Sequence, residues 1–144
     1  MQVAGTSSVD ELNMIKMRFS RFEDITVWQD ARKINTEIWS IIVNSELKND
    51  FGLRNQMSRA SGSIMDNITE GFERDGNKEF SHFLSISKAS CGELRSQLYR
   101  CLDRGYLTIE EFEEVKMKTM TISRKIKALM TYLKNSSLKG SKFK

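Results

Sequence analysis

The segment that decides the fold is NKEFSHFLSISKASCGELRSQLYRC, residues 77–101. Its apolar and small residues recur at alternating steps of four and three, the spacing of a helix face that packs inside a helical bundle. The residues on this face are Phe80, Leu84, Ser87, Cys91, Leu94, Leu98 and Cys101. The sequence therefore predicts a long amphipathic helix with Asn77 as its N-cap, ending before Gly105.

A first helix is predicted upstream, where Thr26 and Gln29 have the spacing of a capping box. Its apolar face comprises Val27, Ala31, Ile34, Ile38 and Ile41. A second stripe on this helix carries Trp28, Trp39 and Ile42, since eleven residues at about 100° each return the chain to within about 20°. This stripe is either a wide extension of the core face or a contact with another subunit, because aromatic residues are enriched in interface cores.

A second helix is predicted from about Leu53 to Glu70, with Gly71 closing it. Its inward face comprises Leu53, Met57, Ala60, Ile64 and Ile68. Gly62 lies in the middle, where glycine costs about 1 kcal/mol relative to alanine. We expect the close approach of a neighbouring helix to offset this cost.

The last predicted helix begins at Thr108, which forms a second capping box with Glu111. Its apolar face comprises Phe112, Val115, Ile122, Ile126, Leu129 and Leu133. Four long amphipathic helices with short connections predict an all-α, up-down-up-down antiparallel four-helix bundle.

The composition agrees with one helical domain. The chain has 144 residues, of which 39% are hydrophobic and 29% charged, enough apolar material for one packed core. With no proline and only eight glycines, it lacks the turn residues that a β-sandwich or a doubly wound sheet needs. We expect a bundle over residues 21–135, an N-terminal extension over 1–20 that is a short helix or disordered, and a flexible basic tail over 136–144. Residues 1–16 either belong to the protein or precede an alternative start at Met17.

Positive charge gathers toward the C-terminus. Nine basic and no acidic residues lie between Lys116 and Lys144. Seven-residue and eleven-residue spacings place three lysines on one face of the last helix, and two more are expected in an adjacent row. With two arginines of the third helix, the candidate nucleic-acid-binding residues are Lys116, Lys118, Lys125, Lys127, Lys134, Arg100 and Arg104. Such a charge run also occurs on plain solvated surfaces, so a polyanion ligand is a hypothesis.

Catalytic and metal chemistry find little support in the sequence. His82 is the only histidine, and Glu79-x-x-His82 lacks the second such pair that a di-iron bundle requires. Cys91 and Cys101 lie on the core face without further ligands nearby, so zinc is not expected. No glycine-rich phosphate loop is present. We expect no catalytic residues, no metal and no cofactor.

Four segments together resemble a known family: FEDITVWQDA (22–31), FGLRNQMSRASGSI (51–64), NITEG (67–71) followed by Arg74, and EFSHFL (79–84). The chain resembles the bacterial four-helix-bundle family also called 23S rRNA intervening-sequence proteins, which includes accessory variability proteins of diversity-generating retroelements. The resemblance covers residues 19–135. It implies a ring-like homo-oligomer, characteristically a pentamer, with a basic surface. Retroelement members bind nucleic acid and partner a reverse transcriptase.

The resemblance also selects a motif at the end of the second helix, formed by Asn67, Glu70, Gly71 and Arg74. We expect these residues to cap and pair there, not to contact a ligand. Met65 stands where family members usually have proline, so the course of this helix is expected to differ locally.

The leading functional hypothesis is a non-enzymatic homo-oligomer that binds RNA or DNA through its basic surface without sequence preference. The alternative is a protein-interaction scaffold or an accessory subunit, for example of a reverse transcriptase, without direct nucleic-acid binding. No secretory signal and no membrane-spanning stretch are recognisable, so we expect a cytoplasmic protein with no membrane partner.

Overall fold

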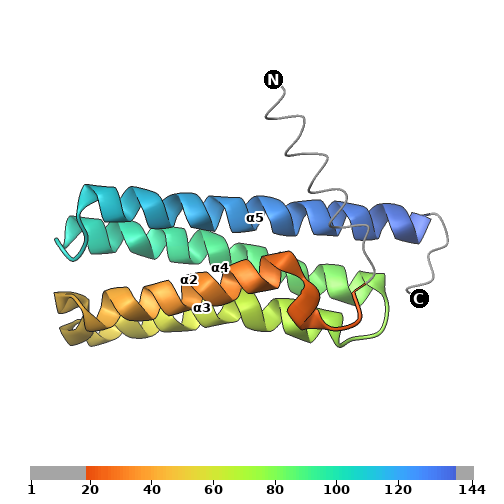
Figure 1. Ribbon diagram of the computed structural model, residues 1–144, viewed down its shortest axis with the longest axis horizontal. Helices are drawn as coiled ribbons and strands as arrows, with labels where there is room; N and C mark the ends of the chain where they lie inside the picture. Colours follow the sequence, from red (N-terminus) through yellow and green to blue (C-terminus); the bar gives the residue numbers. More distant parts are fainter. Residues whose placement is uncertain (1–18, 139–144) are drawn as a thin grey trace, which may run out of the picture.

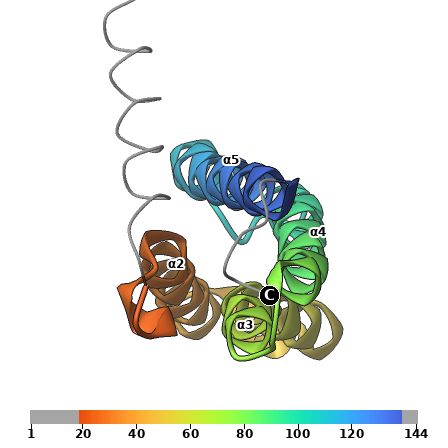
Figure 2. The ribbon, with the colours of Figure 1, turned by 90° about the vertical axis from the view of Figure 1, so that its right-hand side faces the viewer.

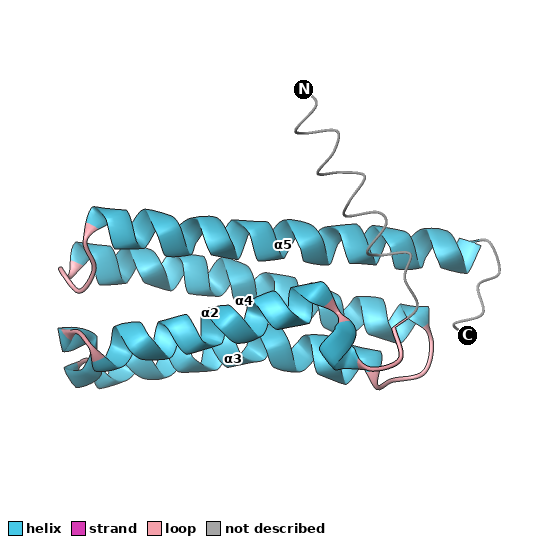
Figure 3. Ribbon diagram, in the orientation of Figure 1, coloured by secondary structure: helices cyan, strands magenta, loops and turns pink. Residues whose placement is uncertain are grey.

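The computed structural model describes residues 19–138, and the predictions for residues 1–18 and 139–144 lie outside it. Its long helices are α2 (Thr26–Val43), α3 (Phe51–Phe72), α4 (Asn77–Asp103) and α5 (Ile109–Leu138). Two short 3-10 helices, η1 (Phe22–Asp24) and η2 (Glu46–Asn49), precede α2 and α3. Figure 3 shows helices joined by short loops, and residues 19–138 contain no strand. The prediction of an all-α chain is confirmed for this part of the molecule.

Successive helices pack side by side, and the chain turns back at each connection. In Figure 1, α2 and α4 run toward one end of the molecule, and α3 and α5 run toward the other. The end-on view of Figure 2 places α3 next to α2 and α4, and α5 next to α4. The contacts of α4 with α3 and α5 are extensive, whereas α2 and α5 meet over a shorter stretch. One side of α5 therefore packs extensively against α4, and another side meets α2 over a shorter stretch.

The predicted helix faces form the core, with one exception on α2. All seven predicted face residues of α4 are buried. On α2, Ile42 is buried and Ile41 is only half-buried, so their predicted roles are exchanged. The reason is that Ile42 lies four residues after Ile38 and about 40° from it, which continues the buried face.

The ends of α4 and α5 close as their sequences predict. The Thr108 backbone N–H donates to Glu111 Oε1 at 2.9 Å, and the Glu111 N–H donates to Thr108 Oγ1 at 3.0 Å. This reciprocal pair is the predicted capping box. At the end of α4, Gly105 has a φ of 79°, and the following Tyr106 N–H donates to the Cys101 carbonyl at 2.9 Å. This is the Schellman motif, which glycine favours because left-handed backbone costs it little.

The predicted capping box at the start of α2 is wrong. The N-cap is Ile25, not Thr26, and its side chain cannot accept a hydrogen bond. The Gln29 side chain donates instead to the backbone carbonyl of Glu23 at 2.8 Å. Gln29 therefore ties η1 to the first turn of α2.

The start of α4 also differs by one residue from the prediction. Gly76 is the N-cap, with a φ of 92° that favours glycine, and Asn77 is the first helical residue. Asn77 is buried, and its Nδ2 donates to the Leu133 carbonyl of α5 at 3.3 Å. The side chain expected to cap α4 therefore joins it to α5.

The close approach of two helices occurs at Gly71, not at Gly62. A Cβ at Gly62 would find only Asn35 Nδ2, 4.0 Å away. A Cβ at Gly71 would lie 2.8 Å from Phe83 Cβ and 2.9 Å from Phe80 Cδ1. Gly71 also lies within α3, which continues to Phe72. The glycine expected to end the helix therefore allows α4 to pack against it.

Both cysteines are free and buried in the core. Burial raises the pKa of the Cys91 thiol to about 12 and that of the Cys101 thiol to about 11. Both side chains are therefore protonated at neutral pH and pack as small apolar groups.

Candidate nucleic-acid interface

The five candidate lysines of α5 do not share one surface. Lys116, Lys127 and Lys134 lie within about 20° of one another around the helix, as predicted. Lys118 and Lys125 do not form an adjacent row, because the two residues from Lys116 to Lys118 turn the helix by about 200°. They face α2, as their ion pairs with it show.

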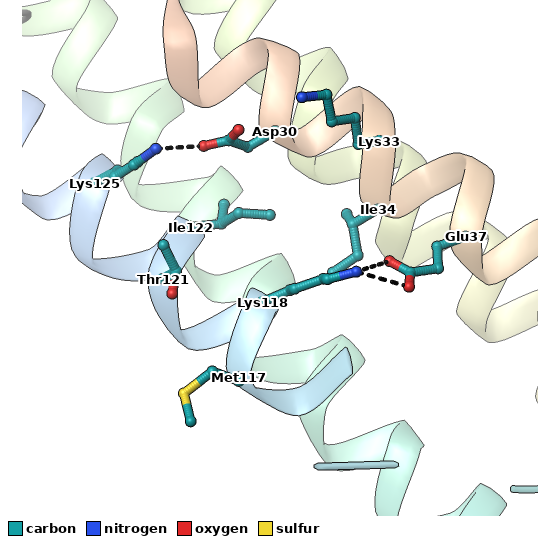
Figure 4. Close-up of a pocket in the computed structure, with 9 residues that line it drawn as sticks. All are labelled: Asp30, Lys33, Ile34, Glu37, Met117, Lys118, Thr121, Ile122 and Lys125. Atoms are coloured by element: carbon teal, nitrogen blue, oxygen red, sulfur yellow. Dashed lines mark hydrogen bonds and ion pairs between the residues drawn. The ribbon is translucent and has the colours of Figure 1, made fainter. Parts of the chain in front are cut away.

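Lys118 and Lys125 are held in ion pairs that join α5 to α2 (Figure 4). The Lys125 Nζ lies 2.6 Å from Asp30 Oδ2, and the Lys118 Nζ lies 2.9 Å from Glu37 Oε2. The hydrogen bond with Glu37 is the main cause of the raised pKa of Lys118. Because each lysine already has a carboxylate partner on α2, the main role of both is to hold α5 against α2. The prediction that they bind nucleic acid is therefore not supported by their surroundings.

Between these ion pairs lies a pocket of about 280 Å³ with Ile34 and Ile122 among its lining residues. Figure 4 shows the two isoleucines between the ion pairs, with Met117 beyond Lys118, toward the beginning of α5. A sequence signal for the pairing existed. Asp30 and Glu37 are seven residues apart on α2, as are Lys118 and Lys125 on α5.

The two candidate arginines of α4 are also engaged within the chain. Arg100 Nη2 donates to Gln56 Oε1 on α3 at 2.6 Å. Arg104 Nη1 donates to Asp50 Oδ2 at 2.6 Å, and the Tyr106 hydroxyl donates to the same oxygen at 2.8 Å. The two bonds to Asp50 join the start of α3 to the segment that follows α4. Arg100 and Arg104 therefore have structural roles at this end of the bundle.

The Asp50 cluster predicts a pH dependence of stability. The hydrogen bonds from Tyr106 and Arg104 hold the pKa of Asp50 below its ordinary value of 3.8. A lowered carboxyl pKa stabilises the fold above the unfolded-state value, and this contribution is lost as the pH falls through the lower, folded-state value. We expect Asp50→Asn to melt at a lower temperature than the natural protein at neutral pH. The gap in melting temperature should narrow below about pH 4. A gap that stays constant in an acid series of thermal unfolding curves would contradict this.

A groove of about 610 Å³ lies between the beginning of α4 and the end of α5. We call it the α4/α5 groove. Within the described part of the chain, none of the residues that line it is acidic. They are Asn77, Lys78, Ser81, His82, Ser85, Lys127, Met130, Thr131, Leu133 and Lys134.

Three lysines give the α4/α5 groove its positive charge. Lys78, Lys127 and Lys134 are exposed, and none has a hydrogen-bond or ion-pair partner among residues 19–138. The hydrogen bond from Asn77 to the α5 backbone holds the two walls together. Two of these lysines were predicted from the spacing on α5, whereas Lys78 was not, because only the fold brings α4 beside the end of α5.

His82 and the hydroxyl groups complete the lining. His82 is exposed, and its ring contacts that of Phe83 edge to face at 5.3 Å. The Ser85 hydroxyl donates to the His82 carbonyl at 2.6 Å. Within residues 19–138, no three His, Cys, Asp or Glu side chains gather as a metal site requires. The groove therefore offers positive charge and hydrogen-bond donors to a ligand.

Lys116 lies outside the groove, near the beginning of α5. Its Nζ is 3.7 Å from Glu113 Oε1 and lies over the rings of Tyr99 and Phe112, at 5.6 and 5.5 Å from their centres. These contacts hold its charge beside Tyr99, near the end of α4.

The motif at the end of α3 is an intramolecular network. Arg74 pairs with Glu70 at 2.8 Å, and its guanidinium lies 4.9 Å from the centre of the Phe83 ring. Asn67 Nδ2 donates to the backbone carbonyl and to the hydroxyl of Ser63, both at 2.9 Å. Together with the packing at Gly71, these contacts join the end of α3 to α4.

The three residues expected on a subunit-facing stripe of α2 have different surroundings. Ile42 is buried, so its assignment to an interface is wrong. Trp28 is half-buried and meets Phe22 of η1 edge to face, with ring centres 5.1 Å apart. Trp39 is 60% exposed. Helical spacing places the two tryptophans on one side of α2, but η1 covers Trp28 and leaves Trp39 exposed.

Among residues 19–138, no helix combines the length and the apolar character needed to cross a membrane.

A sequence model described as 23S rRNA-intervening sequence protein matches residues 23–128. No curated protein matches. A solved structure from Bacteroides thetaiotaomicron, described as a protein of unknown function from the S23 ribosomal protein family, is similar with a TM-score of 0.66. It is 20% identical, and the match covers 72% of this chain and 97% of that one, which supports the shared fold. Because the family match spans most of the helical bundle, the chain belongs to the family of 23S rRNA-intervening sequence proteins.

Proposed function

We propose that this protein is a non-enzymatic homo-oligomer that binds RNA or DNA through the α4/α5 groove. The observation that carries the proposal is the lining of that groove, where residues 19–138 contribute three lysines without a partner in that range and no carboxylate. Lysines act as point charges toward phosphate oxygens, and the hydroxyls of Ser81 and Thr131 in the groove can donate to the same oxygens.

The expected mode of binding is sequence-tolerant. Phosphate contacts position a nucleic acid but carry no base information, and their contribution weakens as salt displaces the released counterions. Lys127 and Lys134 remain the central candidates, and Lys78 joins them from α4. Lys118, Lys125, Arg100 and Arg104 are better explained by the packing of the bundle.

Exposed apolar side chains support self-association. Trp39, Val43 and Phe51 are 60%, 42% and 61% exposed near the connection between α2 and α3. Large apolar side chains at a surface are typical of contacts between subunits. A ring of subunits, with a pentamer as our specific proposal, would also repeat one weak basic groove and so strengthen polyanion binding through multivalency. Light scattering gives the mass directly, and a monomer would contradict this part of the proposal.

The deciding experiment measures the affinity for a generic structured RNA across a salt series. We expect Lys127→Gln with Lys134→Gln to weaken binding about tenfold at about 50 mM salt and to flatten the salt dependence. Lys33→Gln with Lys48→Gln is the matched control, because it removes the same charge from exposed positions on α2 and η2.

Equal binding by the two double variants would contradict a role for the groove. If the natural protein fails to bind RNA or DNA even at about 50 mM salt, where a backbone binder is strongest, the alternative function is favoured. That alternative is a scaffold or an accessory subunit, for example of a reverse transcriptase, with its charge directed at an acidic protein surface.

A further inference from the structure

The positive charge continues beyond the α4/α5 groove along α4. Ser81 lines the groove, and Lys88 and Arg95 follow it at intervals of seven residues. Each interval turns the helix by only about 20°, so the three residues share one side of α4. The wall of the groove is therefore extended by two cations.

Lys88 and Arg95 are available to a ligand. Both are half-buried, and neither has a hydrogen-bond or ion-pair partner among residues 19–138. Both also act electrostatically on the thiol of Cys91, which lies between them in the sequence. Glu93 is two residues from Arg95 and lies about 160° away around the helix, so it does not neutralise this side.

An exposed aromatic side chain marks the far end of this side of α4. Tyr99 lies four residues after Arg95 and is 46% exposed. Its ring meets Phe112 of α5 edge to face at 4.8 Å, and its hydroxyl lies 3.4 Å from Lys116 Nζ. These contacts confirm that this side of α4 borders α5. We call this side of α4, from Lys78 to Tyr99, together with Lys127 and Lys134 of α5, the α4/α5 seam.

We propose that the α4/α5 seam binds a single strand of nucleic acid lying lengthwise along α4. This inference rests on the proposed function and specifies its ligand. From Lys78 to Arg95 the helix rises by about 26 Å, which matches about eight phosphates at about 3.4 Å each in a stacked strand.

The shape of the seam favours one strand over a duplex. Its cations follow one line between two helices, whereas a duplex presents two backbones on either side of a groove that is about 12 Å wide in B-DNA. Proteins that bind single strands combine such a charged track with an aromatic ring on which a base stacks. Tyr99 supplies that ring at one end, and a base there would meet it beside Lys116.

The test uses oligouridylates of about 4, 8 and 12 nucleotides and a duplex of about 8 base pairs. For the natural protein, affinity should rise steeply between the two shorter strands and only slightly thereafter. The duplex should bind more weakly than the strand of the same length. A duplex that binds more tightly, or affinity that does not change with length, would overturn the inference.

The decisive variant is Lys88→Gln with Arg95→Gln, compared with Lys48→Gln with Arg59→Gln as the matched control. The first should reduce affinity for the strand of about 8 nucleotides by about tenfold, nearly to that of the shortest strand. The control, with the same charge loss on η2 and α3, should leave the length dependence intact. Circular dichroism melting shows that each variant is folded.

The outcomes separate this inference from the proposed function. If Lys127→Gln with Lys134→Gln weakens binding but Lys88→Gln with Arg95→Gln matches its control, the groove stands and the seam is rejected. If structured RNA binds the natural protein but no single strand does, only the seam is rejected. If neither structured RNA nor any strand or duplex binds, both are rejected. A second variant tests stacking: Tyr99→Leu should weaken binding at least about fivefold, and Tyr99→Phe should preserve it. Equal effects of these two substitutions would exclude stacking on the ring.

Discussion

Replacing Gly71 with alanine is expected to lower the free energy of unfolding by about 2 kcal/mol. The new Cβ would lie 2.8 Å from Phe83 Cβ, 2.9 Å from Phe80 Cδ1 and 3.1 Å from the Phe80 carbonyl oxygen. Two of these neighbours belong to or adjoin the α4 backbone, so they cannot turn away as the end of a flexible side chain would. The start of α4 must therefore move away from α3 to make room for the new Cβ. Chemical denaturation of the purified variant measures the loss.

Gly62→Ala is the matched control on the same helix. Its Cβ would have no neighbour closer than Asn35 Nδ2 at 4.0 Å, so the higher helix propensity of alanine should stabilise the protein by about 0.5–1 kcal/mol. The two substitutions add the same methyl group to α3, and only their surroundings differ. Similar losses at both positions would show that the contact at Gly71 is not the cause.

Helical periodicity was sufficient to predict the elements of the fold, because each long helix buries one continuous face. The face of α4 is correct at all seven positions, and the α5 capping box depends only on residues three apart in the sequence. The errors arise where a second element decides the environment. The pattern alone could not tell Ile41 from Ile42, and it could not tell that α4 approaches α3 at Gly71 and not at Gly62.

The candidate site was harder to predict because charge alone does not reveal pairing. The prediction from helical spacing placed Lys127 and Lys134 on one face of α5, and both line the groove. It also grouped Lys118 and Lys125 with them, although Asp30 and Glu37 of α2 neutralise those two lysines. Intervals of seven residues identify which side chains share a face, but only the packing of the helices identifies the element that each face meets.

The position of the groove also explains why Lys78 was not predicted as a binding residue. It lies 49 residues before Lys127 in the sequence, in a segment with no marked excess of basic residues. The reversal of the chain between α4 and α5 brings it opposite the end of α5, where the two helices form the groove. A basic site assembled from two helices is therefore only half visible in the charge run of one of them.

Asn67→Ala is expected to lower the free energy of unfolding by about 1–2 kcal/mol while leaving the affinity for RNA unchanged. The Asn67 amide donates twice to Ser63, whose hydroxyl lies 2.8 Å from the Ser90 hydroxyl of α4. Removing the Asn67 amide leaves the carbonyl and hydroxyl oxygens of half-buried Ser63 without this donor. Chemical denaturation and the RNA titration described above measure the two effects.

Asn55→Ala is the control for this substitution, because Asn55 is exposed on the same helix and has no partner among residues 19–138. Both changes bring the same gain in helix propensity, so the control should stay within about 0.5 kcal/mol of the natural protein. The difference between the two variants isolates the hydrogen bonds of Asn67. If Asn67→Ala instead weakened RNA binding at unchanged stability, the amide would be a ligand contact, and the binding surface would extend from the α4/α5 groove to the α3/α4 side of the bundle.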